Sequence, residues 1–429
     1  MTVQTYSAPW QAPRATSPLN AKLWLPGSKS LTNRELVLSA LATEPTRLLK
    51  PLQSRDSALM IEALRALGVG VEVTEDQFLV TPAPLVGPAS IDCGLAGTVM
   101  RFVPPLAGLA TGAIRFDGDA AARKRPMHTT ISSLRSLGLE VITEGAEALP
   151  FTVQATGRVT GGELEIDASS SSQFVSGLLL AAPRFERGLT LHHVGEHLPS
   201  MPHIEMTLET LSRRGVKVSQ PAATSWRVEP GPIAGGTIAI EPDLSNAGPF
   251  LAAAMVAGGS VTIGDWPVNT TQVGNEFDGI LQKMGAKVSR GPSGLTVTGD
   301  GNIHGIEIDL SIGGELTPVV AALAALADSP SRIWGVAHLR GHETDRLAAL
   351  AAEINRLGGI ARETHDGLEI DPAPLHGDLW HTYEDHRMAT AGAIIGLRIA
   401  GVEVEDIATT SKTMPNFPEL WAEMLKGQA

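Results

Sequence analysis

The chain has 429 residues, of which 43% are hydrophobic, and a net charge of −13 at pH 7. This is too long for a single core and predicts two or more domains. The negative charge argues against general nucleic-acid binding, which depends on a basic surface that neutralises many phosphates.

The sequence also predicts the cellular compartment of the protein and indicates that it does not span a membrane. Cys93 is the single cysteine, which excludes an internal disulfide, and residues 1–20 contain no apolar signal segment. We therefore expect a protein of the reducing cytoplasm. The longest apolar stretches, at residues 316–327 and 389–397, are shorter than the roughly 20 residues that span a membrane.

The first predicted helix begins within the segment Pro-Gly-Ser-Lys-Ser-Leu-Thr-Asn-Arg, residues 26–34. A Pro-Gly turn followed by hydroxyl residues leaves backbone N–H groups and the positive end of the helix dipole exposed. Lys29 and Arg34 add two cations beside them. The segment predicts an anion site, although these residues alone also fit an N-capped surface helix with solvated charges.

Five helix endings share one pattern, in which Leu or Ile stands four residues before a Gly. The glycines are Gly68, Gly138, Gly215, Gly285 and Gly358, at steps of 70, 77, 70 and 73 residues, and Gly427 lies 69 further on. The apolar residue indicates the buried edge of a last helical turn, and Gly provides a left-handed cap. The pattern predicts six copies of one structural unit.

Each of these helices is preceded by a helix rich in small residues and then by a strand. The small-residue helices are expected at residues 33–42, 97–110, 172–182, 246–257, 317–327 and 387–399. The strands are expected at residues 46–49, 113–116, 189–194, 260–263, 331–336 and 402–404. Helices that are apolar on all sides are typical of burial among other helices, so the amphipathic helices should lie outside, over sheets.

The domain boundaries follow from the repeat count. Only two residues follow Gly427, so the sixth unit lacks its closing strands and we expect the N-terminal segment to complete it. This predicts a discontinuous domain of residues 1–26 and 243–429 and a second domain of residues 27–242. The active site is expected in the cleft between them.

Polar and charged residues gather at the start of each small-residue helix. A hydroxyl or Gly at one helix start is usually only a cap, but cations where acids would be favoured argue for a ligand site. In chain order these residues are Ser28, Lys29, Ser30 and Arg34; Gly94, Gly97, Thr98 and Arg101; Ser169, Ser170, Ser171, Ser172 and Gln173; Asp243, Ser245 and Asn246; Glu315 and Thr317; Asp385, His386 and Arg387.

Further candidates lie between the repeats. They are residues 123–126, Ser200, residues 338–346 and residues 410–413. A salt-bridged helix start is the alternative interpretation of residues 338–346. His338 and His342 lack a third ligand of comparable quality, so no metal is predicted. The chain has no Gly-x-Ser-x-Gly elbow and no Gly-x-x-x-x-Gly-Lys-Ser/Thr loop, which argues against a serine hydrolase and the commonest nucleotide site.

In these segments the chain resembles the 5-enolpyruvylshikimate-3-phosphate synthase family over nearly its whole length. The strongest stretches are residues 26–34, 95–101, 171–174, 343–347, 385–388 and 412–415. The resemblance implies an α+β fold of two domains, each with three βαβαββ units around buried helices. It also implies transfer of the enolpyruvyl group of phosphoenolpyruvate to the 5-hydroxyl of shikimate 3-phosphate, releasing phosphate, in the shikimate pathway of aromatic amino acid biosynthesis. No cofactor and no metal are implied, and we expect a monomer that closes on its substrates.

The resemblance also assigns residues. Lys29, Glu315 and Glu343 match catalytic positions, with Glu315 expected as the base and Glu343 as the proton donor. The shikimate 3-phosphate site is matched by Lys29, Ser30, Arg34, Ser171, Ser172, Gln173, Ser200, Glu315, His338 and His342. The phosphoenolpyruvate site is matched by Lys29, Gly97, Arg125, Gln173, Arg346, Arg387 and Lys412. Arginine suits carboxylate recognition because its planar fork forms paired N–H bonds.

The chain departs from the commonest family pattern at three places. Glu315 stands where the family usually has Asp, and His338 and His342 stand where it usually has Asn and Lys. Leu95 and Phe102 replace the usual Asn and Pro around the Gly-Thr turn. These differences leave open which groups donate to the shikimate hydroxyls, and how well the family's herbicide ligand glyphosate fits beside Gly97.

Two alternatives are weighed against this interpretation. The sister enzyme that transfers enolpyruvyl to UDP-N-acetylglucosamine usually carries a reactive loop Cys and an Asn after the first Lys, whereas here Cys93 precedes Gly94 and Ser30 follows Lys29. A non-catalytic anion-binding relative would not need both Glu315 and Glu343 in an anionic site.

Overall fold

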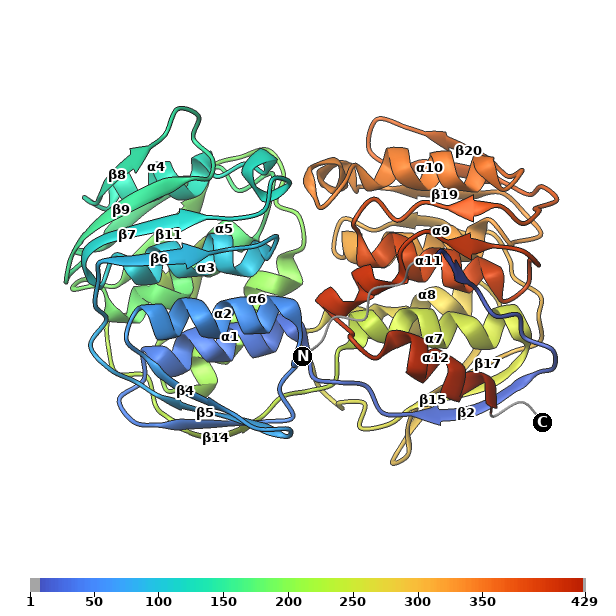
Figure 1. The fold of residues 1–429 in the computed structure, drawn as a ribbon, viewed down its shortest axis with the longest axis horizontal. Helices are drawn as coiled ribbons and strands as arrows, with labels where there is room; N and C mark the ends of the chain where they lie inside the picture. Colours follow the sequence, from blue (N-terminus) through green and yellow to red (C-terminus); the bar gives the residue numbers. More distant parts are fainter. Residues whose placement is uncertain (1–7, 427–429) are drawn as a thin grey trace. The chain divides into compact units, whose positions relative to one another are not determined.

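The computed structural model describes residues 8–426 of the chain (Figure 1). The chain divides into two compact units, which we treat separately. The amino-half domain is Gly27–Ile240, and the carboxyl-half domain consists of the residues up to Pro26 and those from Glu241 onward. The chain therefore passes from one domain to the other twice, after Pro26 and after Ile240.

The amino-half domain has three buried helices, three outer helices and three sheets. The buried helices are α1 (Lys29–Ala40), α3 (Gly97–Ala107) and α5 (Gln173–Ala181), and the outer helices are α2 (Arg55–Ala66), α4 (His128–Ser136) and α6 (Met201–Arg213). The strands are β3 (Thr46–Leu49), β4 (Gly70–Val73), β5 (Gln77–Thr81), β6 (Ala89–Asp92), β7 (Thr111–Asp117), β8 (Glu140–Thr143), β9 (Phe151–Thr156), β10 (Gly162–Ile166), β11 (Leu189–His193), β12 (Val218–Ala222), β13 (Ser225–Val228) and β14 (Gly236–Ala239).

One pairing scheme is used in all three sheets, whose orders are β14-β3-β5-β4, β6-β7-β9-β8 and β10-β11-β13-β12. In the second and third units the strands on either side of the buried helix pair in parallel, as in β6 with β7, where Ala89 faces Ile114; in the first unit β14 takes the place of the leading strand and pairs in parallel with β3. The last two strands form an antiparallel hairpin, as in β8 with β9. A parallel pair needs a long crossover, and the buried helix supplies it. The result is the repeated βαβαββ unit.

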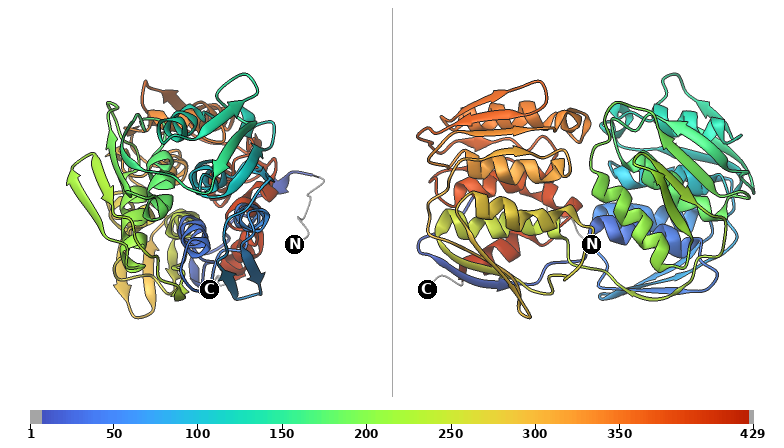
Figure 2. Two further views of the ribbon diagram at one scale, coloured as in Figure 1. Left: turned by 90° about the vertical axis from the view of Figure 1, so that its left-hand side faces the viewer. Right: turned by 180° about the vertical axis from the view of Figure 1, so that it is seen from behind.

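The carboxyl-half domain repeats this architecture (Figure 2). The buried helices are α7 (Leu244–Ala257), α9 (Thr317–Ala324) and α11 (His386–Gly396), and the outer helices are α8 (Phe277–Lys283), α10 (Arg346–Arg356) and α12 (Phe417–Lys426). The strands are β1 (Trp10–Gln11), β2 (Leu19–Leu23), β15 (Gly259–Ile263), β16 (Lys287–Gly291), β17 (Gly294–Gly299), β18 (Glu307–Asp309), β19 (Ser331–Trp334), β20 (Ile360–Glu363), β21 (Leu368–Asp371), β22 (Leu379–Trp380) and β23 (Glu403–Val404). The sheet orders are β16-β17-β15-β2, β18-β19-β21-β20 and β1-β23-β22.

The N-terminal segment serves two units, so the expectation that it completes the sixth unit is only partly correct. Strand β1 does join the sixth unit through β23. Strand β2 instead pairs in parallel with β15 of the fourth unit, with Leu19 opposite Gly259. The reason is that β14, which follows the third unit, returns to pair with β3 of the first. The fourth unit therefore needs its leading strand from elsewhere, and β2 supplies it.

The glycine caps predicted from the repeat are confirmed. Gly68, Gly138, Gly215, Gly285 and Gly358 have φ of 95°, 87°, 80°, 108° and 87°. This left-handed region is costly for any residue with a Cβ atom, so Gly ends each outer helix at the same point. Gly427 lies outside the described residues.

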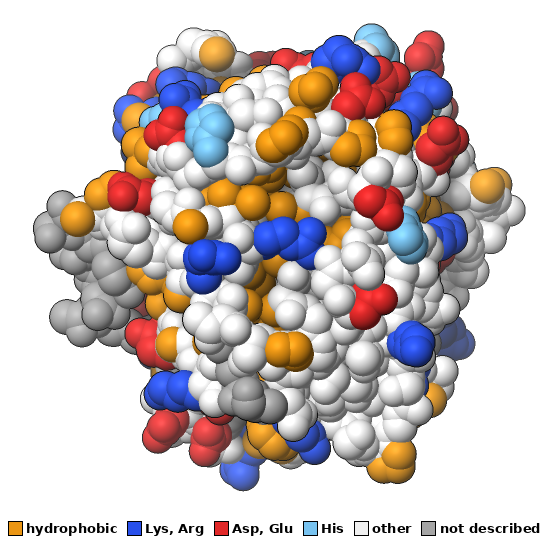
Figure 3. Space-filling view, turned by 90° about the vertical axis from the view of Figure 1, so that its right-hand side faces the viewer, with side chains coloured by type: hydrophobic (Ala, Val, Ile, Leu, Met, Phe, Trp, Pro, Cys, Tyr) orange, Lys and Arg blue, Asp and Glu red, His pale blue; other side chains and the backbone are white. Residues whose placement is uncertain are grey.

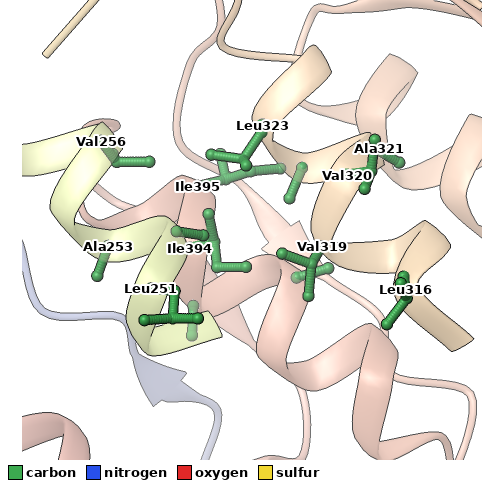
Figure 4. Packing of buried hydrophobic residues seen from close by; sticks show 14 of the residues in the cluster. Leu251, Ala253, Val256, Leu316, Val319, Val320, Ala321, Leu323, Ile394 and Ile395 are labelled. Carbon is green, nitrogen blue, oxygen red and sulfur yellow. The ribbon is translucent and has the colours of Figure 1, made fainter. Parts of the chain in front are cut away.

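The buried helices of the carboxyl-half domain pack against one another through apolar side chains (Figure 4). Leu251 of α7, Val319 of α9 and Ile394 of α11 all belong to one core and are at most 2% exposed.

No helix within residues 8–426 has the length and apolar character needed to cross a membrane. On the face of the carboxyl-half domain shown in Figure 3, hydrophobic side chains gather near the middle among Lys, Arg, Asp and Glu, so this face carries no single block of negative charge.

Arg398 closes the C-terminal ends of the buried helices of the carboxyl-half domain. Its guanidinium donates to Val256 O at the end of α7 (3.0 Å), to Leu326 O after α9 (3.2 Å) and to Gly301 O (2.6 Å). The last carbonyls of a helix have no partner within it and carry the negative end of its dipole, which a cation stabilises. Burial lowers the pKa of Arg398.

We predict that Arg398→Met destabilises the carboxyl-half domain by about 3 kcal/mol, because carbonyls that receive charged hydrogen bonds lose their donor. Urea unfolding followed by tryptophan fluorescence is a suitable measurement, since of the 7 tryptophans only Trp226 lies in the amino-half domain. The matched control is Arg332→Met, where a guanidinium lies over the Trp334 ring at 5.5 Å and a loss below about 1 kcal/mol is expected. Equal losses in the two variants would contradict the capping role.

Candidate active site

The starts of the three buried helices of the amino-half domain converge. Asn33 in the first turn of α1 donates to Thr98 in the first turn of α3 at 2.7 Å. Arg34 of α1 donates to Ser176 of α5 at 3.3 Å. A Cβ atom added to Gly97 at the start of α3 would lie 3.0 Å from Oε1 of Gln173, the first residue of α5. Three positive helix ends therefore meet in one place.

Gly97 lies at the centre of this convergence and is surrounded by cations. The same added Cβ atom would lie 3.3 Å from the guanidinium groups of both Arg101 and Arg125. Ala96, which precedes α3, offers no side-chain cap to its N–H groups. In residues 8–426, Oε1 of Gln173 and Nε of Arg125 are buried without a hydrogen-bond partner. Exposed helix N–H groups with two guanidinia and no acid form a cradle for an anion.

Lys29 begins α1 and contacts one carboxylate. Its Nζ lies 3.5 Å from Oδ2 of Asp56, a buried residue in the first turn of α2. Sequence reasoning missed Asp56. Its signal is local: Ser54 and Ser57 form a capping box that fixes the start of α2 and with it the Asp56 side chain.

Arg34 is held by neutral groups within its own domain. It is 2% exposed, and its guanidinium donates to Thr207 Oγ1 (2.8 Å), Ser30 O (2.9 Å), His203 O (2.8 Å) and Ser176. These acceptors are hydroxyls and backbone carbonyls, so most donors of the guanidinium are already occupied.

The predicted serines lie at the starts of α5 and α6. Ser171 Oγ accepts the backbone N–H of Gln173 at 3.2 Å, and the adjacent Ser172 provides no side-chain cap. Ser200 precedes α6 with φ 54° and ψ 49°. A residue with a Cβ atom in the left-handed region is strained, and such strain is concentrated at functional sites.

The helix starts of the carboxyl-half domain also converge, but around carboxylates. Ser245 in the first turn of α7 donates to Glu315 Oε1 at 3.4 Å, and Glu315 precedes α9. Glu315, Asp243 and Asp385 are the negative charges that favour the charged form of Arg387 in the first turn of α11, and Glu315 has the largest effect of the three. The three buried helices thus bring Ser245, Glu315 and Arg387 together.

Arg346 is anchored by acids at the start of α10. Its Nε donates to Asp385 Oδ2 at 2.7 Å and its Nη2 donates to Glu343 Oε2 at 2.9 Å. Its Nη1 donates to Nδ1 of His342 at 3.1 Å, so that imidazole nitrogen is the acceptor and His342 is neutral. Burial opposes the charge, but Asp385 and Glu343 overcome it and raise the pKa of Arg346.

Glu343 bridges two cations. Its Oε1 binds Nζ of Lys412, and its Oε2 binds Arg346. Lys412 is 8% exposed and ends the short helix Ile407–Lys412. Two neighbouring cations fix the position of a carboxylate and favour its ionised form. Glu343 can therefore accept a proton only when another anion binds one of these two cations in its place.

Arg387 is the least compensated cation of this group. Across residues 8–426, no hydrogen bond or ion pair to its guanidinium is found; its backbone N–H donates to Asp385 Oδ1 at 2.8 Å and its carbonyl accepts from Thr390 Oγ1 at 3.1 Å. Burial lowers the pKa of Arg387, and Glu315 opposes that effect. A half-buried guanidinium whose N–H donors are unoccupied is suited to a carboxylate or a phosphate.

His338 is neutral at physiological pH. Burial lowers its pKa to about 4, against a raising effect of Glu315. Its Nε2 is buried without a partner in the described chain, and it lies close to Gly314, where an added Cβ atom would approach it to 2.5 Å. The imidazole therefore sits beside the Glu315 backbone as an uncharged group.

The structure thus gathers the predicted residues into two sets, one in each domain. Lys29, Ser30, Arg34, Gly97, Arg125, Ser171, Ser172, Gln173 and Ser200 belong to the amino-half domain, and Glu315, His338, His342, Glu343, Arg346, Arg387 and Lys412 belong to the carboxyl-half domain. Within residues 8–426, no group of three or more His, Cys, Asp or Glu side chains is arranged to hold a metal ion.

Comparison with known proteins gives consistent matches. The family model of EPSP synthase (3-phosphoshikimate 1-carboxyvinyltransferase) matches residues 13–421. A 3-phosphoshikimate 1-carboxyvinyltransferase of Kocuria rhizophila is 56% identical over 428 residues, covering 97% of this chain and 96% of that protein. Two solved structures of EPSP synthase from Acinetobacter baumannii have TM-scores of 0.81 and 0.78 at 23% identity; both cover 97% of this chain, and 98% and 97% of their own.

Two domains of repeated βαβαββ units, with cations and carboxylates at the ends of buried helices, define an enzyme that handles small anions. The chain belongs to the EPSP synthase family. The family resemblance, the α+β two-domain fold and the transferase class predicted from the sequence are confirmed. The matches favour this family over the enzyme that acts on UDP-N-acetylglucosamine.

Proposed function

We propose that the protein transfers the enolpyruvyl group of phosphoenolpyruvate to the 5-hydroxyl of shikimate 3-phosphate and releases phosphate. The observation that carries this proposal is the half-buried guanidinium of Arg387, which has no hydrogen bond or ion pair among residues 8–426 and whose charged form the Glu315 carboxylate favours. Such a pair provides an anion anchor next to a group that accepts a proton. Addition of a hydroxyl to an anionic enol ester requires both.

The amino-half residues support binding of the anionic parts of both substrates. Four cations, Lys29, Arg34, Arg101 and Arg125, lie near the start of its buried helices. These local cations are needed because the chain as a whole has a charge of −13. Fixed cations and helix N–H groups hold phosphates without reorganisation during the reaction.

The carboxyl-half residues support the proton transfers. In the addition step the 5-hydroxyl loses its proton to Glu315 while its oxygen bonds to carbon 2 of phosphoenolpyruvate, and carbon 3 receives a proton. In the elimination step carbon 3 gives up a proton and phosphate leaves carbon 2. We assign the carbon 3 proton to Glu343, which becomes available when a substrate anion takes over Lys412. Lys29 assists at either position.

We further propose that the two sets of residues face one another across a cleft between the domains and that substrates close it. Each set alone is incomplete, because the amino-half cations lack the two glutamates. The predicted contacts of His338 and His342 with shikimate 3-phosphate, and the monomeric, cytoplasmic state, remain part of this proposal. The lone Cys93 is buried with a pKa raised to about 12 by that burial, which fits a chain that uses no thiol chemistry.

The direct test is a phosphate-release assay with shikimate 3-phosphate and phosphoenolpyruvate. We expect turnover that depends on both substrates, and a decrease of roughly 10²-fold or more in kcat for Glu315→Gln with substrate binding within a few-fold, because an amide cannot accept the proton. Glu369→Gln, in strand β21 of the same domain, where the side chain is 41% exposed, is the matched control and should not change kcat. Near-normal turnover in Glu315→Gln would exclude this residue as the base.

Arg387→Lys separates charge from geometry. Lysine keeps the cation but loses the planar fork, so we expect phosphoenolpyruvate affinity to fall by about 1.5–3 kcal/mol, the range for hydrogen bonds to charged groups. Shikimate 3-phosphate binding to the free protein should change little, because most of its predicted ligands lie in the other domain. Calorimetric titration with each ligand distinguishes the outcomes: equal weakening of both would indicate a structural role.

Domain closure predicts a change in overall size. Because ligands for the anions come from both domains, bound substrate should draw the domains together. Small-angle X-ray scattering with shikimate 3-phosphate and a phosphoenolpyruvate analogue should give a smaller radius of gyration than the protein alone. An unchanged radius would argue against closure.

A further inference from the structure

The turn between β22 and α11 is strained. Its residues Tyr383 and Glu384 have φ of 53° and 56°. Two consecutive residues with Cβ atoms in the left-handed region are unfavourable, and such a conformation persists only when the surrounding contacts impose it. The turn is followed at once by Asp385 and by Arg387, so whatever holds it also sets the position of the Arg387 guanidinium.

Glu353 of α10 holds the beginning of this turn. Its carboxylate is fully buried and accepts the backbone N–H of His381 at 3.0 Å and the Tyr383 hydroxyl at 2.7 Å. Nδ1 of His381 lies 3.2 Å from the same carboxylate. A separate bond ties the next residue, because the N–H of Thr382 donates to Glu405 at 3.0 Å.

Arg346 holds the end of the same turn from the same helix. It binds Asp385 through Nε at 2.7 Å, and it stands seven residues before Glu353, which places the two side chains on one face of α10, two helical turns apart. Asp385 is buried and caps α11 through the N–H of Arg387. Helix α10 therefore contacts both ends of the strained turn, through Glu353 at its beginning and through Arg346 at its end.

Among residues 8–426, the Tyr383 bond to Glu353 is the one long-range side-chain hydrogen bond made by the two left-handed residues. Tyr383 is 39% exposed, so its ring contributes little to the core. Its partial burial and the Glu353 carboxylate raise the pKa of Tyr383 to about 12. The phenol therefore remains a hydrogen-bond donor at every pH at which the enzyme would work.

We propose that Tyr383 is a positioning residue for Arg387: by donating to Glu353, its hydroxyl keeps the left-handed turn in the conformation that presents the guanidinium to an anionic substrate. The inference rests on the proposed function, in which Arg387 binds phosphoenolpyruvate. It assigns a role to a residue that touches neither substrate nor the reacting atoms.

The test is Tyr383→Phe, which removes only the hydroxyl. We expect the KM for phosphoenolpyruvate to rise roughly three- to tenfold, the effect of losing one hydrogen bond, with kcat and the KM for shikimate 3-phosphate within twofold. Amide hydrogen exchange in residues 381–388 should become faster in the protein without ligand. The matched control is Thr262→Val, which removes the hydroxyl pair of Thr262 and Thr296 (2.8 Å) in the sheet of the fourth unit and should alter neither quantity.

A second substitution tests the strain directly. Glycine adopts the left-handed conformation without cost. In the double variant Tyr383→Phe/Glu384→Gly the turn should therefore depend less on the Tyr383 hydrogen bond, and at least half of the lost phosphoenolpyruvate affinity should be recovered. A merely structural hydrogen bond predicts no such recovery.

The outcomes separate the two proposals. An unchanged KM for phosphoenolpyruvate in Tyr383→Phe, or an equal rise for both substrates, would overturn the positioning role. If the unmodified protein shows no turnover of these substrates, the proposed function fails. In that case amide hydrogen exchange of residues 381–388 still tests whether Tyr383 holds the turn. Unchanged exchange in Tyr383→Phe would show that the hydroxyl does not hold it.

Discussion

The structure depends on one constraint: each domain buries three whole helices at its centre. Burial favours helices that are apolar on every side, as α7, α9 and α11 are where Leu251, Val319 and Ile394 meet. Polar groups then concentrate at the helix ends, where the backbone itself has N–H and C=O groups that need partners; α1 differs, because Glu35 and Ser39 are buried along its length and bind Arg214. In the carboxyl-half domain the N-terminal ends carry Ser245, Glu315 and Arg387, and the C-terminal ends are closed by Arg398.

The two domains use this constraint with different electrostatics. In the amino-half domain the guanidinium of Arg34 donates to a hydroxyl and a backbone carbonyl. In the carboxyl-half domain Arg346 is held by Asp385 and Glu343. These two carboxylates fix the position of the guanidinium but offset its positive charge, so little electrostatic attraction remains for an anionic ligand. Arg387 is the exception there. Its position is set by the backbone of a strained turn rather than by an acid on its side chain, which leaves the fork open.

The repeat, the buried helices and the gathering of polar residues at the helix starts could be predicted from the sequence because their signals are local. The Leu-x-x-x-Gly ending, the Gly cap at Gly68 and the hydroxyls before α1 each lie within a few residues. What could not be predicted are pairings between distant segments: Lys29 with Asp56, Tyr383 with Glu353, and β2 with β15. Nor does sequence reveal how the donors of Arg34 and Arg346 are used, because that depends on which acceptors the fold brings to them.

The pairing of β2 with β15 has a consequence for biosynthesis. Strand β2 leaves the ribosome early, but its partner, which begins at Gly259, is made roughly 240 residues later, about 12 to 48 seconds at usual translation rates. The whole of Gly27–Ile240 emerges in that interval and has every strand it needs, including β14 for β3. The amino-half domain can therefore fold first on the nascent chain, while β2 waits with an unsatisfied backbone edge that is a natural target for chaperones.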